Sequence, residues 1–184
     1  MALKRLVIDG FGQVELNNVA FRRDGRIEAQ CALDSTDFAT VPAENGMLLA
    51  VDNVKRVVKF AEDATLPIAL NYTTEHMYDE RTPGLKNFKL DIKDGFLPRL
   101  GYLSVGDKYT TNCISYDTDE FTDEETFLEA LDDLSTAQIY GGIAADGSTK
   151  ISKTKPSAGP VLLVVKKTTM PDGQLGIKLQ VLSA

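Results

Sequence analysis

The last part of the chain, residues 159–182, places the strongest constraint on its fold. Residues 161–165 (Val-Leu-Leu-Val-Val) form an apolar run that is too short for a helix and suits a strand covered on both faces. In residues 170–173 (Met-Pro-Asp-Gly), proline presets φ for a type I turn and glycine accepts the conformation that follows. Residues 177–181 then alternate between apolar and polar side chains, which is the period of a strand. These patterns predict a β-hairpin that closes the fold.

Composition indicates an ordinary folded protein. The chain has 184 residues, of which 43% are hydrophobic and 26% charged, and we expect a single domain over residues 1–184. Its formal net charge of -7 disfavours non-specific binding to nucleic acid or to an anionic membrane, so we expect neither partner. The start of the chain lacks the apolar core of a signal peptide, and no apolar run is long enough to span a bilayer. We therefore expect synthesis and folding in a cytoplasm.

Short apolar or alternating segments separated by turn residues fill most of the chain, including six Asp-Gly or Gly-Asp pairs. Short strands separated by frequent turn residues predict a mainly β fold, barrel-like or sandwich-like, with many hairpins. Residues 54–60 also fit helical spacing, but their valines favour a strand. The segments with strand character are residues 14–21 (interrupted at 17–18 and followed by a turn at 23–26), 27–33, 47–51, 54–60, 67–72, 88–92 and 109–116.

One helix is expected near residues 123–134. Thr122 as N-cap and Glu125 at the third helical position match a capping box. Apolar residues then recur at the spacing of one helix face, namely Phe127, Leu128, Leu131 and Leu134. If the domain has an internal boundary, it lies near residues 117–121, just before this helix.

The sequence contains no recognisable catalytic or metal-binding set. The single histidine, His76, lies within residues 73–87, and one imidazole does not make a zinc site or complete a nucleophile–base pair. The acidic cluster at residues 117–125 lacks the spacing and the glycine of a calcium-binding EF-hand loop. Cys31 and Cys113 sit among apolar residues and are expected to be buried, reduced thiols. We expect no enzyme activity, no metal and no cofactor.

Four short phrases of turn and strand residues carry a family resemblance. They are residues 43–49 (AENGMLL), 96–107 (FLPRLGYLSVGD), 110–112 (TTN) and 168–174 (TTMPDGQ). In these phrases the chain resembles the capsid decoration (cement) proteins of tailed bacteriophages, which are encoded beside the major capsid protein. The resemblance extends over about residues 43–117 and 140–182 and rests on these phrases rather than on one diagnostic motif.

The resemblance implies a virion structural protein that binds the outer surface of an assembled capsid and stabilises the shell. The implied partner is the major capsid protein, and the implied location is the capsid exterior. A homo-oligomer is expected, with a trimer favoured. Residues 1–10 are then a candidate arm that reaches a neighbouring subunit, and the candidate partner contacts are Lys4, Arg5, Leu6 and Val7.

Two alternatives stay open at this point. A tail-tube or head-to-tail connector subunit would belong to the same class of virion proteins. A small-ligand-binding or glycan-binding β-domain belongs to a different class, and a hydrolase of this kind would use His76 and the loop at residues 73–87.

Overall fold

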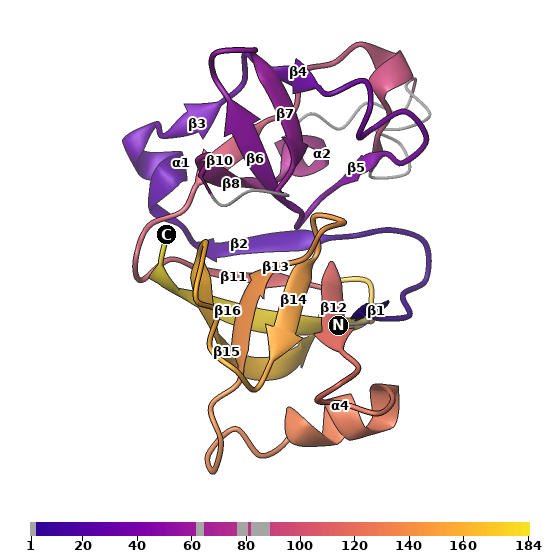
Figure 1. Ribbon diagram of the computed structural model, residues 1–184, viewed down its shortest axis with the longest axis vertical. Helices are drawn as coiled ribbons and strands as arrows, with labels where there is room; N and C mark the ends of the chain where they lie inside the picture. The colour runs from indigo at the N-terminus through magenta and orange to yellow at the C-terminus, as the bar shows by residue number, and fades with distance from the viewer. Residues whose placement is uncertain (1–2, 62–64, 77–80, 82–88) are drawn as a thin grey trace.

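The computed structural model of the chain describes residues 3–61, 65–76, 81 and 89–184. About 40% of the structure is strand and 10% helical, which confirms the expected mainly β fold. The described strands form an eight-stranded sheet, a six-stranded sheet and a two-stranded sheet, and they do not close into a barrel. Figure 1 shows the six-stranded sheet above the eight-stranded one, with β2 along the border between them.

The eight-stranded sheet combines both ends of the chain. Its strand order is β1-β12-β14-β13-β15-β16-β11-β2, and its pairs are antiparallel except for the parallel pair β12–β14. The strands are β1 (Leu3–Arg5), β2 (Val14–Asn18), β11 (Lys108–Thr111), β12 (Ile114–Asp117), β13 (Tyr140–Ile143), β14 (Thr149–Ser152), β15 (Val161–Thr169) and β16 (Leu175–Ser183).

The expected C-terminal hairpin is present as β15 and β16. The Gly173 N–H donates to the Met170 carbonyl at 2.9 Å, and Gly173 has φ +90°, a value that favours glycine. The inward side chains of β16 are fully buried, namely Ile177, Leu179 and Val181. The expectation that residues 161–165 are covered on both faces is wrong at the end of the run, because Val165 is 38% exposed.

The six-stranded sheet has the order β3-β10-β8-β6-β7-β4, and the small sheet pairs β5 with β9. Their strands are β3 (Ile27–Glu28), β4 (Ala32–Leu33), β5 (Ala43–Glu44), β6 (Leu48–Asp52), β7 (Val57–Phe60), β8 (Ile68–Asn71), β9 (Lys89–Leu90) and β10 (Leu100–Tyr102). The two larger sheets share a hydrophobic core, since Leu48 of β6 and Leu70 of β8 pack in one cluster with Leu179 of β16. A second cluster lies around Met47, Val58 and Cys113.

Several expected strands are interrupted in the structure. The strand expected at residues 14–21 ends at Asn18, and α1 (Ala20–Asp24) follows because Phe21 turns into the core with no exposed surface. The expected strand at residues 27–33 is divided into β3 and β4, and that at 109–116 into β11 and β12. Residues 54–60 are strand only from Val57, because Asp52 accepts the backbone N–H groups that follow it and so forms a turn.

The short helical elements are α2 (Thr73–His76), η1 (Ile92–Asp94) and α4 (Glu124–Ala130), of which α4 is the expected helix. Its N-cap is Asp123 rather than Thr122, because the Asp123 carboxylate accepts the Thr126 N–H at 2.8 Å. The helix ends at Ala130, with Leu131 as its C-cap, earlier than expected. At the predicted internal boundary, Phe121 is buried with its ring 5.3 Å from that of Phe127, and the boundary stays a prediction.

Candidate functional site

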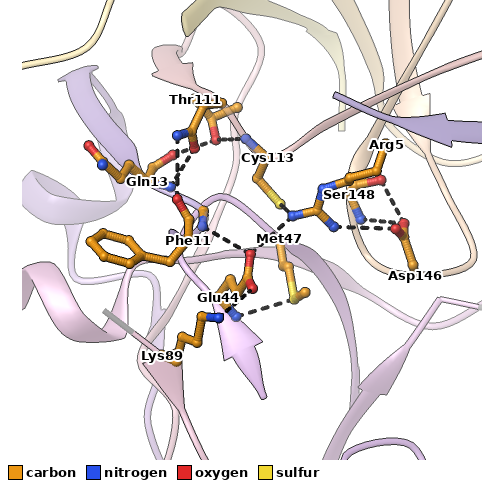
Figure 2. A network of polar contacts seen from close by, with 12 residues as sticks. Arg5, Phe11, Gln13, Glu44, Met47, Lys89, Thr111, Cys113, Asp146 and Ser148 are labelled. Atoms are coloured by element: carbon orange, nitrogen blue, oxygen red, sulfur yellow. Dashed lines mark hydrogen bonds and ion pairs between the residues drawn. The ribbon is translucent and has the colours of Figure 1, made fainter. Parts of the chain in front are cut away.

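Arg5, at the end of β1, lies at the centre of a polar network between the eight-stranded sheet and the small sheet (Figure 2). Its guanidinium pairs with Glu44 Oε2 at 3.1 Å and with Asp146 Oδ2 at 3.3 Å. One Nη atom also lies 3.2 Å from Cys113 Sγ. Glu44 in turn accepts the Gly12 N–H at 2.9 Å. The network therefore connects β1, β5, the residue before β12 and the turn between β13 and β14.

The chemistry of this network is structural rather than nucleophilic. Burial raises the pKa of the Cys113 thiol to about 12, although the nearby Arg5 lowers it. A thiol that stays protonated is a poor nucleophile and a poor metal ligand. Burial of the Arg5 guanidinium opposes its charge, but the carboxylates of Glu44 and Asp146 raise the Arg5 pKa above its ordinary value. Arg5 is therefore a permanent cation that fastens β1 to the rest of the fold.

The N-terminal end of β2 is held by segments that are distant in the sequence. The Gln13 N–H donates to Asn112 Oδ1 at 2.6 Å, and the Thr111 hydroxyl donates to the Gln13 carbonyl at 2.6 Å. The Gln13 side-chain amide donates to the Asp172 carboxylate at the tip of the β15–β16 hairpin. Gly46 packs closely against Thr111 and Gln13, because a Cβ on Gly46 would lie 2.1 Å from Thr111 Oγ1 and 3.1 Å from the Gln13 carbonyl oxygen. The backbone at Gln13 is thus fixed from three sides.

The C-terminal end of β2 is fixed in a similar way. Asp107 accepts the Ala20 N–H at 2.8 Å through one carboxylate oxygen and the Ser104 N–H at 2.8 Å through the other. Thr110 of β11 donates to Asn17 Oδ1 at 2.7 Å. Residues 12–20 therefore have little freedom to move relative to the sheet.

A groove with a volume of about 680 Å³ runs along β2. It is lined by the consecutive residues 13–17, and by Phe11, Asn45, Met170, Pro171 and Asp172. Successive side chains of a strand point to opposite faces, so a groove that contacts all of residues 13–17 follows the edge of the strand rather than one face. β2 is the end strand of its sheet, which is consistent with this position.

The charged residues that line the groove are both acidic, Glu15 and Asp172. Although some desolvation opposes its ionisation, hydrogen bonds from Gln13 and Gln174 lower the pKa of the exposed Asp172 below its ordinary value. Within the described chain, the half-buried Glu15 carboxylate has no hydrogen bond or ion pair. The groove therefore combines an edge strand with an unpaired negative charge.

A second pocket, of about 550 Å³, lies where β12 and β14 end near residues 155–159. Asp117 in this pocket pairs with Lys150 at 2.7 Å, and the Asp117 side chain is only 3% exposed. The hydrogen bond from Lys150 lowers the pKa of Asp117. Despite its partial burial, Glu120 also has a lowered pKa, because the Lys153 N–H and the Thr154 and Ser152 hydroxyls donate to it. These carboxylates stay ionised at neutral pH and are not tuned for general acid catalysis.

The four candidate partner contacts fall into two groups. Arg5 is engaged in the network described above, and Leu6 is 2% exposed with its N–H bonded to the Ile114 carbonyl at 2.9 Å. Lys4 is exposed on β1, and Val7 is 75% exposed just after it. The contact of this segment with a partner stays a prediction, and only Lys4 and Val7 present exposed side chains for it.

His76 is the last residue of α2, and its side chain lies outside the described residues, as do residues 77–80 and 82–88 of the loop assigned to it. Among the side chains that are described, no group of three or more His, Cys, Asp or Glu residues is arranged to hold a metal ion. In the same part of the chain, no helix is both long and apolar enough to cross a membrane. Both cysteines are free and buried, as expected.

Comparison with protein-family models, with curated proteins and with solved structures finds no match to this chain.

Sequence reasoning missed both the Arg5 network and the groove. Residues 14–16 showed strand alternation, but nothing local indicated that this strand ends a sheet. The partners of Arg5 are 39 and 141 residues away along the chain, which no periodic pattern reveals.

Proposed function

We propose that this protein is a structural component of a bacteriophage virion that binds the outer surface of the assembled capsid as a decoration protein. One observation carries the proposal: the four phrases that resemble decoration proteins, although scattered in sequence, all contact residues 12–20. Glu44 of the first phrase binds Gly12, and Asp107 of the second binds Ala20. The third and fourth phrases bind Gln13 through Asn112 and Asp172. The four phrases therefore meet around one segment of the fold, residues 12–20.

Rigidity supports the proposal. A protein that reinforces a shell transmits load between its neighbours, so its contact region must not deform. In this chain the Arg5 network fastens β1, and the bonds of Gln13 and Asp107 fasten the two ends of β2. Repeated placement on a symmetric shell makes modest individual contacts collectively tight. The proposed partner is the major capsid protein, the proposed state is a homo-oligomer such as a trimer, and the proposed location is the capsid exterior.

The test mixes the purified protein with shells assembled without it. We expect saturable co-sedimentation at a fixed number of copies per capsomer, and a rise in the thermal midpoint of the shell. The matched control is the same protein after irreversible heat unfolding, which should do neither. If the native protein neither sediments with the shells nor shifts their midpoint, the proposal is wrong. Rings or tubes formed by the protein alone, seen by electron microscopy, would instead favour the tail-tube or connector alternative.

A further inference from the structure

We propose that the groove along β2 binds an extended segment of another protein by strand addition, and that this segment carries a lysine or arginine opposite Glu15. The identity of that protein as the shell subunit rests on the proposed function, whereas the chemistry of the segment does not.

The first reason is the position of β2 in the sheet. β2 pairs with β11 on one side, and the described residues place no strand on its other side. An edge strand presents unpaired backbone groups that an incoming extended segment can satisfy, and peptide-binding domains commonly use this mode. The groove follows the strand from residue 13 to residue 17, a length of about 17 Å at 3.4 Å per residue, which accommodates a segment of similar length.

The second reason is that the far wall of the groove is rigid. Met170 is 3% exposed and packs against Gly176, where a Cβ would lie 2.5 Å from the Met170 sulfur. The Met170 N–H donates to the Gln174 carbonyl at 2.7 Å, which closes the hairpin tip. Gln13 and Asp172 then connect this tip to the start of β2. A preformed groove costs less ordering on binding than one that must be assembled.

The third reason is charge, and it identifies the kind of occupant. Glu15 and Asp172 are the charged side chains of the lining, so a basic residue in the segment gains an ion pair with Glu15. A second copy of this chain is a poor occupant, because pairing β2 with β2 of another copy would bring these carboxylates together. Nucleic acid is a poor occupant for the same reason. The complement is therefore an extended, basic segment of a different protein.

The experiment compares three single variants in the shell-binding assay. Glu15→Lys reverses the charge of the groove, Glu15→Gln removes it, and Glu129→Lys makes the same reversal at an exposed position of α4 as the matched control. We expect affinity for the shells to fall by about tenfold for Glu15→Lys and less for Glu15→Gln. Glu129→Lys should bind like the wild type. Equal binding by all four proteins would overturn the inference and leave the proposed function intact.

A second measurement works without any shell. Two capped nine-residue peptides of alternating valine and threonine differ only in a central lysine or glutamate. The lysine peptide should bind the wild type more tightly and protect from hydrogen exchange those backbone amides of residues 14–17 that do not face β11. Glu15→Lys should reverse the preference. If the protein binds no shells but shows this pattern, the proposed function fails and the inference holds. If neither peptide protects these amides, or both do so equally, the inference fails.

Discussion

Replacing Arg5 with methionine tests whether the polar network fastens the N-terminal strand. The Arg5 side chain is 30% exposed, and its partners Glu44 and Asp146 are 16% and 50% exposed. A hydrogen bond to a charged group contributes about 1.5–3 kcal/mol, and the more exposed pair with Asp146 contributes less than about 1 kcal/mol. Lys89, at 3.8 Å from Glu44, compensates part of the loss. We therefore expect Arg5→Met to lower the free energy of unfolding by about 2 kcal/mol.

The assay is urea denaturation followed by circular dichroism, with thermal unfolding as a second readout. A loss of about 2 kcal/mol in a domain of this size corresponds to a fall of about 4–8 °C in the midpoint. Lys4→Met, which removes a neighbouring exposed cation on the same strand, is the control and should change stability by less than about 0.5 kcal/mol. The double variant Arg5→Met with Glu44→Gln should lose less than the sum of the single losses.

Two results together would refute the reasoning. The free energy of unfolding of Arg5→Met would lie within about 0.5 kcal/mol of the wild-type value, which is the usual error of additivity for distant sites. The losses of the two single variants would also add up to the loss of the double variant. These results would mean that β1 is held by its backbone pairing with β12 and by Leu6 rather than by the charges.

Two further predictions concern a buried ion pair and a close backbone approach. The pKa of Asp117 is lower in the folded protein than in the unfolded chain, where it is about 3.9. The ionised Asp117 therefore contributes its full stabilisation above about pH 3.9, and this stabilisation is lost as the pH falls through the folded-state pKa. Asp117→Asn should therefore destabilise the protein at pH 7 and make the acid limb of the stability–pH curve, measured by urea titration, less steep. Gly46→Ala should lower the free energy of unfolding by more than about 3 kcal/mol, since φ is +87° and the Cβ would clash with Thr111. Gly106→Ala, at φ +92° with open space around the Cβ, should lower it by about 1–2 kcal/mol in the same assay. Similar losses for the two glycine variants would contradict the close approach.

Local signals were sufficient for part of the fold. The turn chemistry of residues 170–173 and the alternation of residues 177–181 predicted the C-terminal hairpin, and α4 was expected from acidic and apolar residues at helical spacing. The sequence-based predictions were wrong where two local conformations were both compatible with the sequence and tertiary contacts selected one of them. Phe21 fits a strand pattern, but burial of its ring against Tyr72, with centroids 5.2 Å apart, accompanies a helical turn. At the start of α4, a carboxylate at Asp123 capped the helix in preference to the Thr122 hydroxyl.

The sequence by itself determined that this protein is mainly β and that its end is a hairpin, because strand period and turn residues act within a few positions of each other. Only the tertiary structure decided that Arg5 would be an internal anchor rather than an exposed contact, since its carboxylate partners come from β5 and from the turn before β14. The same holds for the groove, because the end strand of a sheet is defined by which strands pair. Those pairings join residues 90 or more positions apart along the chain, such as Glu15 and Thr110.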